Sequence, residues 1–316
     1  MTGGHERPAA AHGKLRHVVG ALVMLSCLAA PRQCFAQRLE RVAVVWDNDI
    51  LALRGTGAPP DYDYTQGLLL TAAFRGAFRP LRRWLEPEGD DAAEAARTTL
   101  RLGVGQRIYT PRQDAAEPVP GERPYAGWLY VVADVSAFHV GTEHNVAVEL
   151  GITGPAALGE HVQNGIHRLV GATPQQGWKH QLHAEPAALV RYTAAWPRTF
   201  AGLQLRPHIG VGAGTLWTGA AGGLAIGAAA RPANRGLYAG ADVRQELVIH
   251  NLFLDGNTFR TSVRTDKRAW VSEAAFAVGY RFRVWDIAYR FVIRSAEYRA
   301  QPRPHAYGSL VLVWHR

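Results

Sequence analysis

The sequence predicts an all-β fold, a twelve-stranded antiparallel β-barrel that crosses a membrane, and three observations support this. Segments of roughly ten residues alternate between apolar and polar side chains, which is typical of strands in transmembrane barrels. The 11 Tyr and 9 Trp residues favour β structure. No run of about eighteen apolar residues occurs, so a helical membrane protein is a poor interpretation.

Residues 1–36 have the organisation of an export signal. Arg7, Lys14 and Arg16 precede the apolar run Val18–Ala30, and Cys34-Phe35-Ala36 then offers small residues at a cleavage site. A short buried helix fits this pattern less well. We therefore expect residues 37–316 to form one mature domain, an outer-membrane barrel.

Both cysteines, Cys27 and Cys34, lie in the predicted signal. A lipoprotein site at Cys27 is poorly supported, because Cys27 is followed by more apolar residues. The mature chain would contain no cysteine, which excludes disulfides, thiolate catalysis and cysteine metal sites.

The composition limits the classes of partner. Hydrophobic residues make up 47% and charged residues 19% of the 316-residue chain, so disorder and coiled coil are excluded. The net charge is +9, and the mature chain would keep 31 basic and 25 acidic residues. This balance permits an anionic partner. No compact Lys/Arg run is present, so we expect outer-membrane lipids and no nucleic acid as partners.

Twelve segments are predicted as strands. In residues 284–294, for example, Trp285, Ile287 and Tyr289 share one face, and Asp286 and Arg290 share the other. An even count places both termini in the periplasm and the connections after odd-numbered strands outside the cell, which leaves 76–97 as a long periplasmic connection. The predicted strands are 41–49, 63–75, 98–109, 126–138, 143–153, 179–194, 199–212, 215–230, 236–250, 268–282, 284–298 and 305–315.

Alternation alone leaves two environments open. A soluble sandwich would bury the apolar face of each strand, whereas a membrane barrel would turn it toward lipid. The export signal, the strand length and the aromatics near strand ends favour the barrel, which also satisfies every backbone hydrogen bond. We expect a monomer in the Gram-negative outer membrane.

One segment departs from the strand pattern. Pro155–Val170 carries Leu158, Val162 and Ile166 at four-residue spacing and ends before Gly171, which predicts a short amphipathic helix. It follows the fifth strand, so we expect it at the extracellular rim.

Polar residues gather at this same rim. Asn48 and Asp49 end the first strand, and Thr65 begins the second. On the helix, Gln163 and His167 are four residues apart and share one face. His167 could act as a general base, and the oxygens of Asp49 and Gln163 could bind Ca²⁺. From residue types alone, solvated or packed side chains are the more common interpretation.

The chain resembles the outer-membrane lipid A 3′-O-deacylase family (LpxR-like). The resemblance covers roughly residues 40–195, and it depends on the order and spacing of several short motifs. They are Asn48-Asp49, Asp63-Tyr64-Thr65-Gln66-Gly67, Gly105-Gln106-Arg107-Ile108-Tyr109-Thr110-Pro111, Arg123-Pro124-Tyr125-Ala126-Gly127-Trp128, Gly154-Pro155, Gly159-Glu160-His161-Val162-Gln163-Asn164-Gly165-Ile166-His167 and Gly177-Trp178-Lys179-His180-Gln181-Leu182.

The resemblance implies a carboxylic ester hydrolase that depends on calcium. Such enzymes remove the 3′-linked acyloxyacyl group from lipid A of lipopolysaccharide in the outer leaflet. The implied roles are His167 as the base, Asp49 and Gln163 near the metal, and Asn48 and Thr65 as polar groups that shape the site.

The sequence departs from this family at two places. Thr173 stands where some members carry an acidic residue after the helix. Residues 112–122 contain no lysine, although a basic residue there helps to bind substrate in some relatives; Arg112 or Arg123 could replace it.

Other functions fit less well. No Gly-x-Ser-x-Gly motif is present, and none of the 13 histidines has a serine two positions later, so a serine nucleophile is not expected. A non-enzymatic outer-membrane pore or structural barrel remains the main alternative, but it does not require polar residues gathered on one rim. A secreted β-sandwich binding protein is the third hypothesis.

Overall fold

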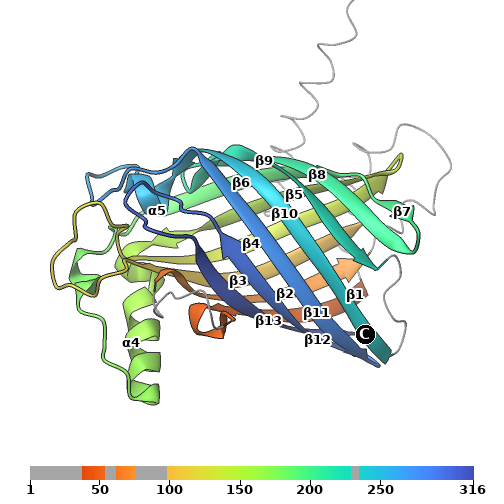
Figure 1. Ribbon diagram of the computed structural model, residues 1–316, viewed down its shortest axis with the longest axis horizontal. Helices are drawn as coiled ribbons and strands as arrows, with labels where there is room; N and C mark the ends of the chain where they lie inside the picture. The colour runs from red at the N-terminus through yellow and green to blue at the C-terminus, as the bar shows by residue number, and fades with distance from the viewer. Residues whose placement is uncertain (1–37, 54–61, 76–97, 229–234) are drawn as a thin grey trace, which may run out of the picture.

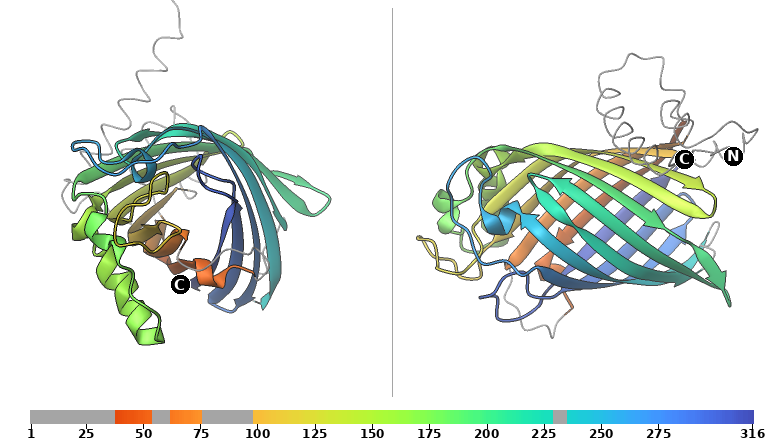
Figure 2. Two further views of the ribbon diagram at one scale, coloured as in Figure 1. Left: turned by 60° about the vertical axis from the view of Figure 1, so that its left-hand side comes forward. Right: turned by 90° about the horizontal axis from the view of Figure 1, so that it is seen from above.

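Thirteen labelled strands form one sheet that closes on itself as a barrel (Figure 1, Figure 2). The computed structural model describes residues 38–53, 62–75, 98–228 and 235–316, so the predicted signal peptide and the connection 76–97 lie outside the described residues. The strands are β1 (Arg38–Asn48), β2 (Asp63–Arg75), β3 (Thr99–Thr110), β4 (Ala126–His139), β5 (Thr142–Thr153), β6 (Pro186–Ala195), β7 (Arg198–Phe200), β8 (Leu203–Gly214), β9 (Trp217–Ala228), β10 (Arg235–Asn251), β11 (Trp270–Phe282), β12 (Trp285–Arg294) and β13 (His305–His315).

The labels β6 and β7 belong to one interrupted strand. Both pair with β8, and the backbone N–H of Trp196 between them donates to the carbonyl of Pro207 at 2.9 Å. Pro197 has no N–H to donate, so the ladder is interrupted there. The described residues therefore form a closed twelve-stranded antiparallel barrel, as predicted, with β1 paired to β13 and β6 paired to β8.

The sixth predicted strand began too early. Residues 179–185 precede the strand, because Gly177–His180 forms a 3₁₀ turn, η4, and β6 begins only at Pro186. The other predicted strands overlap the observed ones, and their ends differ by a few residues.

Side chains alternate between the lumen and the outside of the wall. In β3, Arg107 faces a cavity in the lumen, whereas Leu102 and Val104 face outward and are 39% and 47% exposed. An exposed apolar band on the outside of a barrel is stable only against lipid, which excludes the soluble sandwich. Other exposed members of this band are Leu68, Leu70, Val131, Ile209, Leu310 and Leu312.

The predicted helix is shorter than expected. Pro155 lies in a separate 3₁₀ turn, η3 (Gly154–Ala157), and Leu158 adopts a left-handed conformation with φ of 60° before α4 (Gly159–Val170) begins. Among the described residues, no helix is long and apolar enough to cross a membrane.

The orientation of α4 is unusual. Its buried side chains are the polar Gln163, Asn164 and His167, whereas Leu169 is 85% and Val170 67% exposed. A helix on a soluble protein normally buries its apolar face. This arrangement fits a helix at the rim of a membrane protein, with its polar face against the barrel and apolar side chains directed outward.

Described residues of the extracellular connections pack into one end of the lumen. Phe253 of the short helix α5 (Leu252–Asp255) packs with Trp128 and Tyr130 from the barrel wall and with other buried apolar residues. The indole of Trp128 stacks on Tyr130 at 5.8 Å, so these two aromatics pack inside the barrel and do not form a membrane belt. Other buried apolar residues of this cluster include Leu182, Leu216 and Leu252.

A buried cluster of charges links two of the connections at this end to the first residue of β2. The guanidinium of Arg123 lies 3.2 Å from Glu297 and 3.5 Å from Asp63, and it stacks over the ring of Tyr109. Glu297 also accepts from Arg294 at 2.9 Å. Burial raises the pKa of Glu297, but Arg294 and Arg123 outweigh it and lower the pKa to about 2.

Replacing Arg123 with alanine should lower the free energy of unfolding by about 3–5 kcal/mol, because the buried Asp63 loses its cation and Glu297 keeps only Arg294. Thermal unfolding of the folded protein in detergent, followed by circular dichroism, measures the change. Arg112→Ala is the matched control: Arg112 is partly exposed and lies 3.6 Å from Glu122, so the loss should stay under about 1 kcal/mol.

Within this cluster, Glu297 makes the barrel sensitive to acid, whereas burial raises the pKa of Asp63 to about 7 and gives the opposite pH dependence. The pKa of Glu297 in the folded state, about 2, is below the value of about 4.3 expected for an unfolded chain. Its contribution to stability is therefore complete above about pH 4.3 and is lost as the pH falls toward 2. Equal stability of wild type and Arg123→Ala at pH 7 would contradict this account of the cluster.

Candidate active site

A β-bulge turns Thr65 to the outside of the barrel. Tyr64 pairs with Tyr109 and Gln66 pairs with Ile108, so Thr65 is an extra residue without a partner in the ladder. Bulges change the direction of side chains and are common beside active sites. Gly67 faces the lumen beside Asp47, so an unbroken strand would also place Thr65 in the lumen; the extra residue in the ladder turns Thr65 outward.

Hydrogen bonds show the two directions. The hydroxyl of Tyr64 donates to Asp47 in the lumen at 2.8 Å. The hydroxyl of Thr65 lies 2.7 Å from that of Thr110, which points outward because its neighbour Tyr109 lines the lumen. Thr65 and Thr110 thus form a buried hydroxyl pair on the outer face of the wall.

Asn48 and Asp49 lie on the same outer face. After β1 the chain folds into a 3₁₀ turn, η2 (Asp49–Leu51), with Asn48 as its N-cap. The turn lies directly on β13, where a Cβ on Gly308 would be 2.4 Å from the carbonyl oxygen of Leu51. The hydroxyl of Tyr289 also donates to that carbonyl at 2.7 Å. A glycine is therefore required for η2 to reach this position.

A second glycine, on the other side of Thr65, allows the start of the α4 helix to pack closely against the wall. A Cβ on Gly127 of β4 would lie 3.1 Å from the Cβ of Ala157 and 3.3 Å from the backbone nitrogen of Gly159. The side-chain amide of Gln106, on β3, donates to the carbonyl of Ala157 at 2.7 Å. These contacts hold the start of α4 against the outside of β3 and β4.

The structure therefore places all five predicted site residues on the outer, lipid-facing side of the wall at the extracellular end. Asn48 and Asp49 lie over β1 and β13, Thr65 lies on β2, and Gln163 and His167 lie on the buried face of α4 beside β3 and β4. Figure 1 shows η2 and α4 near the same end of the barrel. The sequence predicted that these residues lie at the extracellular rim, but it did not predict that they lie on the outer face of the wall.

The orientation of His167 is set by the chain that follows α4. Its Nδ1 lies 2.6 Å from the carbonyl oxygen of Thr173. A carbonyl can only accept, so Nδ1 carries the proton and Nε2 is the basic nitrogen of the neutral ring. Thr173 stands where some relatives carry an acidic residue, and here its backbone carbonyl accepts the hydrogen bond from His167.

A network of side chains holds this following segment in place. Asn164 forms a reciprocal pair with the backbone of Gln175: its Oδ1 accepts at 2.8 Å and its Nδ2 donates at 3.3 Å. The hydroxyl of Tyr125 contacts Gln175 at 2.6 Å and Asp114 at 3.1 Å. Asn164 and Tyr125 belong to the motifs that carry the resemblance, whereas nothing in the sequence indicated Gln175 or Asp114.

Gln163 is fixed by an aromatic neighbour. The indole N–H of Trp178 donates to the Oε1 of Gln163 at 3.1 Å, and Trp178 packs against Tyr125 with ring centroids 5.0 Å apart. Trp178 also lies against Gly159, where a Cβ would be 2.8 Å from the ring. Two of the recurring motifs, around Tyr125 and Trp178, thus act together to position α4.

The oxygens on both sides of the site suit a hard cation. Asp49 Oδ2 accepts from the backbone N–H of Tyr62 at 2.9 Å, and Gln163 Oε1 accepts from the indole N–H of Trp178 at 3.1 Å. Within the described ranges, no group of three or more His, Cys, Asp or Glu could hold a metal. This donor chemistry fits Ca²⁺ held through carboxylate, amide and carbonyl oxygens, and does not fit Zn²⁺.

Arg123 is not available for substrate. It is buried in the charge cluster at the mouth of the barrel, so the suggestion that it replaces the missing lysine is wrong. Arg112 is partly exposed and remains the candidate.

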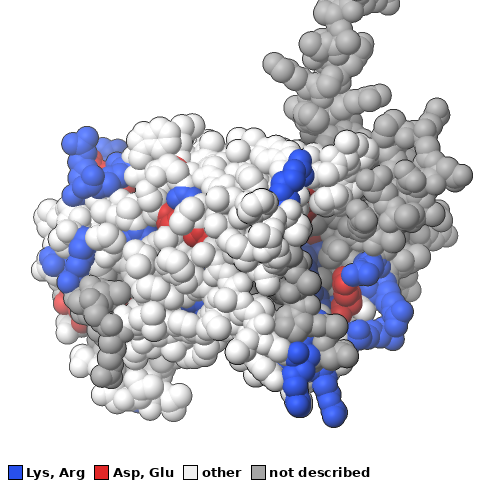
Figure 3. All heavy atoms as spheres, turned by 45° about the vertical axis from the view of Figure 1, so that its right-hand side comes forward, with Lys and Arg blue, Asp and Glu red and all other residues white. Residues whose placement is uncertain are grey.

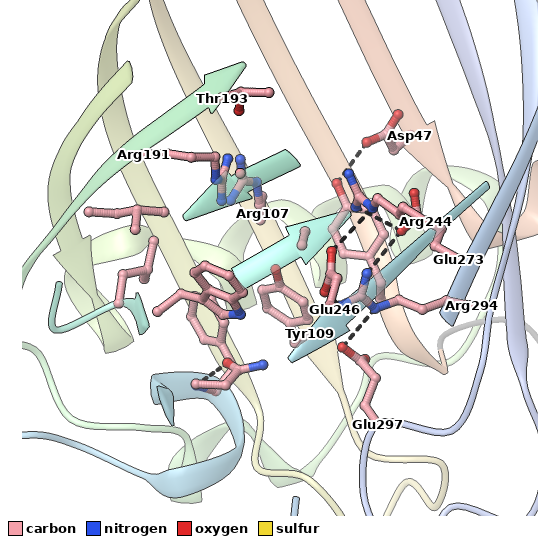
Figure 4. A pocket seen from close by; sticks show the side chains of 18 of the residues that line it. Asp47, Arg107, Tyr109, Arg191, Thr193, Arg244, Glu246, Glu273, Arg294 and Glu297 are labelled. Carbon is pink, nitrogen blue, oxygen red and sulfur yellow. Dashed lines mark hydrogen bonds and ion pairs between the residues drawn. The ribbon is translucent and has the colours of Figure 1, made fainter. Parts of the chain in front are cut away.

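Figure 4 shows the cavity inside the barrel, which is separate from this site. It has a volume of about 410 Å³, and none of the five site residues lines it. Its charges pair with one another: Arg244 lies 3.1 Å from Glu246 and 3.0 Å from Glu273, and Arg294 lies 2.6 Å from Glu246. The cavity therefore forms the polar interior of a membrane barrel.

A family model described as "Outer membrane protein LpxR" matches residues 18–316. The chain belongs to the LpxR family. The resemblance drawn from the motifs is thus confirmed, and with it the expected location in the outer membrane. No curated protein matches the sequence closely enough to count as a relative.

A solved structure of an LpxR protein shows the same fold. LpxR from Salmonella typhimurium matches with a TM-score of 0.73 and 19% sequence identity, covering 87% of this chain and 100% of that chain. The translocator domain of the autotransporter NalP from Neisseria meningitidis matches with a TM-score of 0.44 and 8% identity, covering 96% and 98%. The β domain of the Bordetella autotransporter BrkA gives 0.45 and 10%, covering 88% and 99%.

Asn164→Ala should reduce ester hydrolysis by about 10–100-fold without unfolding the barrel, because it frees the segment that orients His167. Asn164→Asp keeps the acceptor for the N–H of Gln175 and should retain more activity. Glu160→Ala, an exposed change on the same helix, is the control. Heat-modifiable gel migration reports folding, and full activity in folded Asn164→Ala would refute the positioning role.

Proposed function

We propose that the protein is a calcium-dependent lipid A 3′-O-deacylase, which hydrolyses the ester of the 3′-linked acyloxyacyl group of lipopolysaccharide in the outer leaflet. The observation that carries this proposal is the location of the polar site on the lipid-facing side of the wall. Family membership supports an outer-membrane lipid A deacylase in general. Calcium and the 3′ position follow from the resemblance of the site motifs.

The location suits a lipid substrate. The acyl chains of lipid A can stay beside the apolar outer band, which includes Leu68 and Leu102, while the ester reaches the rim. The buried hydroxyls of Thr65 and Thr110 lie at the upper end of this band. A site in the lumen would instead require the lipid to pass through a closed wall of hydrogen-bonded strands.

His167 supplies the base for this reaction. With Nδ1 held by the carbonyl of Thr173, its Nε2 takes a proton from water as the water oxygen bonds to the ester carbonyl carbon. The tetrahedral intermediate then collapses, the bond to the sugar 3′ oxygen breaks, and that oxygen receives the proton. The products are a free acyloxyacyl acid and a 3′ hydroxyl. No serine or cysteine nucleophile is needed.

The remaining polar residues bind and orient. Asp49 and Gln163 would hold Ca²⁺, which when bound polarises the carbonyl and stabilises the negative charge on its oxygen. Asn48 and Thr65 would hydrogen-bond the sugar or the oxyanion, because their polar groups lie between η2 and α4. We propose that the enzyme acts as a monomer, since one chain contributes all five residues.

A pore is the less favourable alternative. The described residues of the extracellular connections fill the mouth of the barrel, with Phe253 and Leu252 packed against Trp128. The buried pair of Thr65 and Thr110 on the outer face has no role in conduction. Both features favour an enzyme that uses its barrel as a scaffold.

His167→Ala should reduce deacylation by about 10²–10⁴-fold, the usual cost of losing a positioned general base. Mass spectrometry of lipid A from cells expressing each variant measures the loss of the acyl group. His161→Ala is the matched control, because His161 is exposed on the same helix and lies outside the site. A folded His167→Ala protein with wild-type turnover would show that the proposed base is wrong.

Removal of divalent cations should abolish hydrolysis, and Ca²⁺ should restore it better than Zn²⁺. Asp49 is the single carboxylate among the proposed ligands, so the affinity should be weak, about 10⁻⁴–10⁻³ M. The assay is turnover of purified lipid A by metal-stripped protein, with heat-modifiable migration as the control for folding. Undiminished turnover in excess chelator would remove the metal from the mechanism.

A further inference from the structure

A group of exposed arginines lies on the extracellular connections, away from the proposed ester site. Arg260 and Arg264 belong to the β10–β11 connection, and Arg299 belongs to the β12–β13 connection. We call these three residues the arginine surface. Arg260 and Arg264 line one shallow hollow, and Arg264 and Arg299 line a second beside it.

The distribution of charge on the barrel agrees with this grouping. In Figure 3 the outer wall is mostly white, whereas Lys and Arg side chains gather near the two ends. The extracellular end is the one that meets the phosphate-bearing headgroups of the outer leaflet.

The three arginines make no ion pair within the described part of the chain, unlike their basic neighbour. Lys267 lies 2.7 Å from Asp255, which His250 also contacts at 3.2 Å. Burial raises the pKa of Asp255, but these two hydrogen-bonding partners outweigh it and lower the pKa to about 2. Asp255 is therefore ionised and already neutralised, so it does not offset the arginines.

The charge balance remains positive. Besides Asp255, the acidic residue lining the hollows is Asp266, against Arg260, Arg264, Arg299 and Lys267. Four basic and two acidic side chains leave a net charge of +2 on this small surface.

The backbone beneath the arginine surface is held by hydrogen bonds. The N–H of Arg299 donates to the carbonyl of Asp266 at 2.8 Å, and the N–H of Arg268 donates to Glu297 at 2.7 Å. The hydroxyl of Thr265 donates to the carbonyl of Gly121 at 2.6 Å. Two connections far apart in sequence are thus joined, and they present Arg264 and Arg299 together at little cost in conformational entropy.

The tip that carries Arg260 is also anchored. Glu185 accepts from the backbone N–H groups of Thr258 at 2.8 Å and Phe259 at 3.2 Å. Asn257 and the backbone of His183 donate to each other at 2.9 and 2.8 Å. The neighbouring Arg260 is exposed.

We propose that the arginine surface binds the phosphate groups of lipopolysaccharide packed around the extracellular rim. Guanidinium groups match phosphate with paired hydrogen bonds, and an arginine that lacks a protein partner can donate all of them to a ligand. This binding site lies outside the ester site, and its occupancy does not depend on hydrolysis.

The test is binding of the full folded protein in detergent to fluorescently labelled lipopolysaccharide at fixed ionic strength. Replacing all three residues, Arg260→Gln, Arg264→Gln and Arg299→Gln, should weaken binding by about 10–100-fold, because each basic residue near an anionic surface contributes severalfold. Chemically dephosphorylated lipopolysaccharide should bind wild type as weakly as the intact lipid binds the triple variant. Deacylation is assayed in parallel, so failure of the proposed function is separated from failure of this binding.

Arg38→Gln, Arg41→Gln and Arg283→Gln, three exposed positions on the periplasmic half, together form the control matched for charge and should bind like wild type. Unchanged affinity of the triple variant, or equal binding of the dephosphorylated lipid to wild type, would overturn the proposal. An equal loss in the control would assign the effect to net charge alone. Displacement by millimolar inorganic phosphate would identify a free-phosphate site and would also overturn it.

Discussion

The whole structure depends on the strict alternation of side chains in a closed hydrogen-bonded wall. Closure satisfies every ladder and leaves no edge, so the wall separates two environments completely. Each residue of a strand then belongs either to the charged lumen or to the lipid-facing band. The paired charges of Arg244 and Glu273 follow on one side, and the exposed Leu102 and Val104 follow on the other.

The proposed active site occupies places where this alternation is modified. The bulge at Thr65 adds one residue and so delivers a hydroxyl to the outer face without disturbing Tyr64 in the lumen. Gly308 and Gly127 have no side chain on that face, so η2 and the start of α4 can pack directly against the strands there. A chemically polar site is thereby built on a wall that is otherwise suited only to lipid.

The extracellular connections give the barrel a closed end and a charged exterior. At the barrel mouth, Arg123 and Glu297 join the β3–β4 and β12–β13 connections through buried charges, and Phe253 packs inside the mouth. Above, the same framework of backbone hydrogen bonds supports the arginine surface. Stability and the proposed recognition of headgroups thus use one set of connections, while the proposed hydrolysis takes place on the side of the barrel.

Alternating polarity along each strand was sufficient to predict twelve strands and an antiparallel barrel, because a period of two is a local property of the chain. Motif order was sufficient to identify the family and to nominate Asn48, Asp49, Thr65, Gln163 and His167. The boundary of α4 was missed, because the left-handed Leu158 that ends η3 has no distinctive residue type. The face of the wall, the carbonyl of Thr173 at His167 and the burial of Arg123 were decided only by the tertiary structure, since register, a bulge and contacts between distant connections determine them.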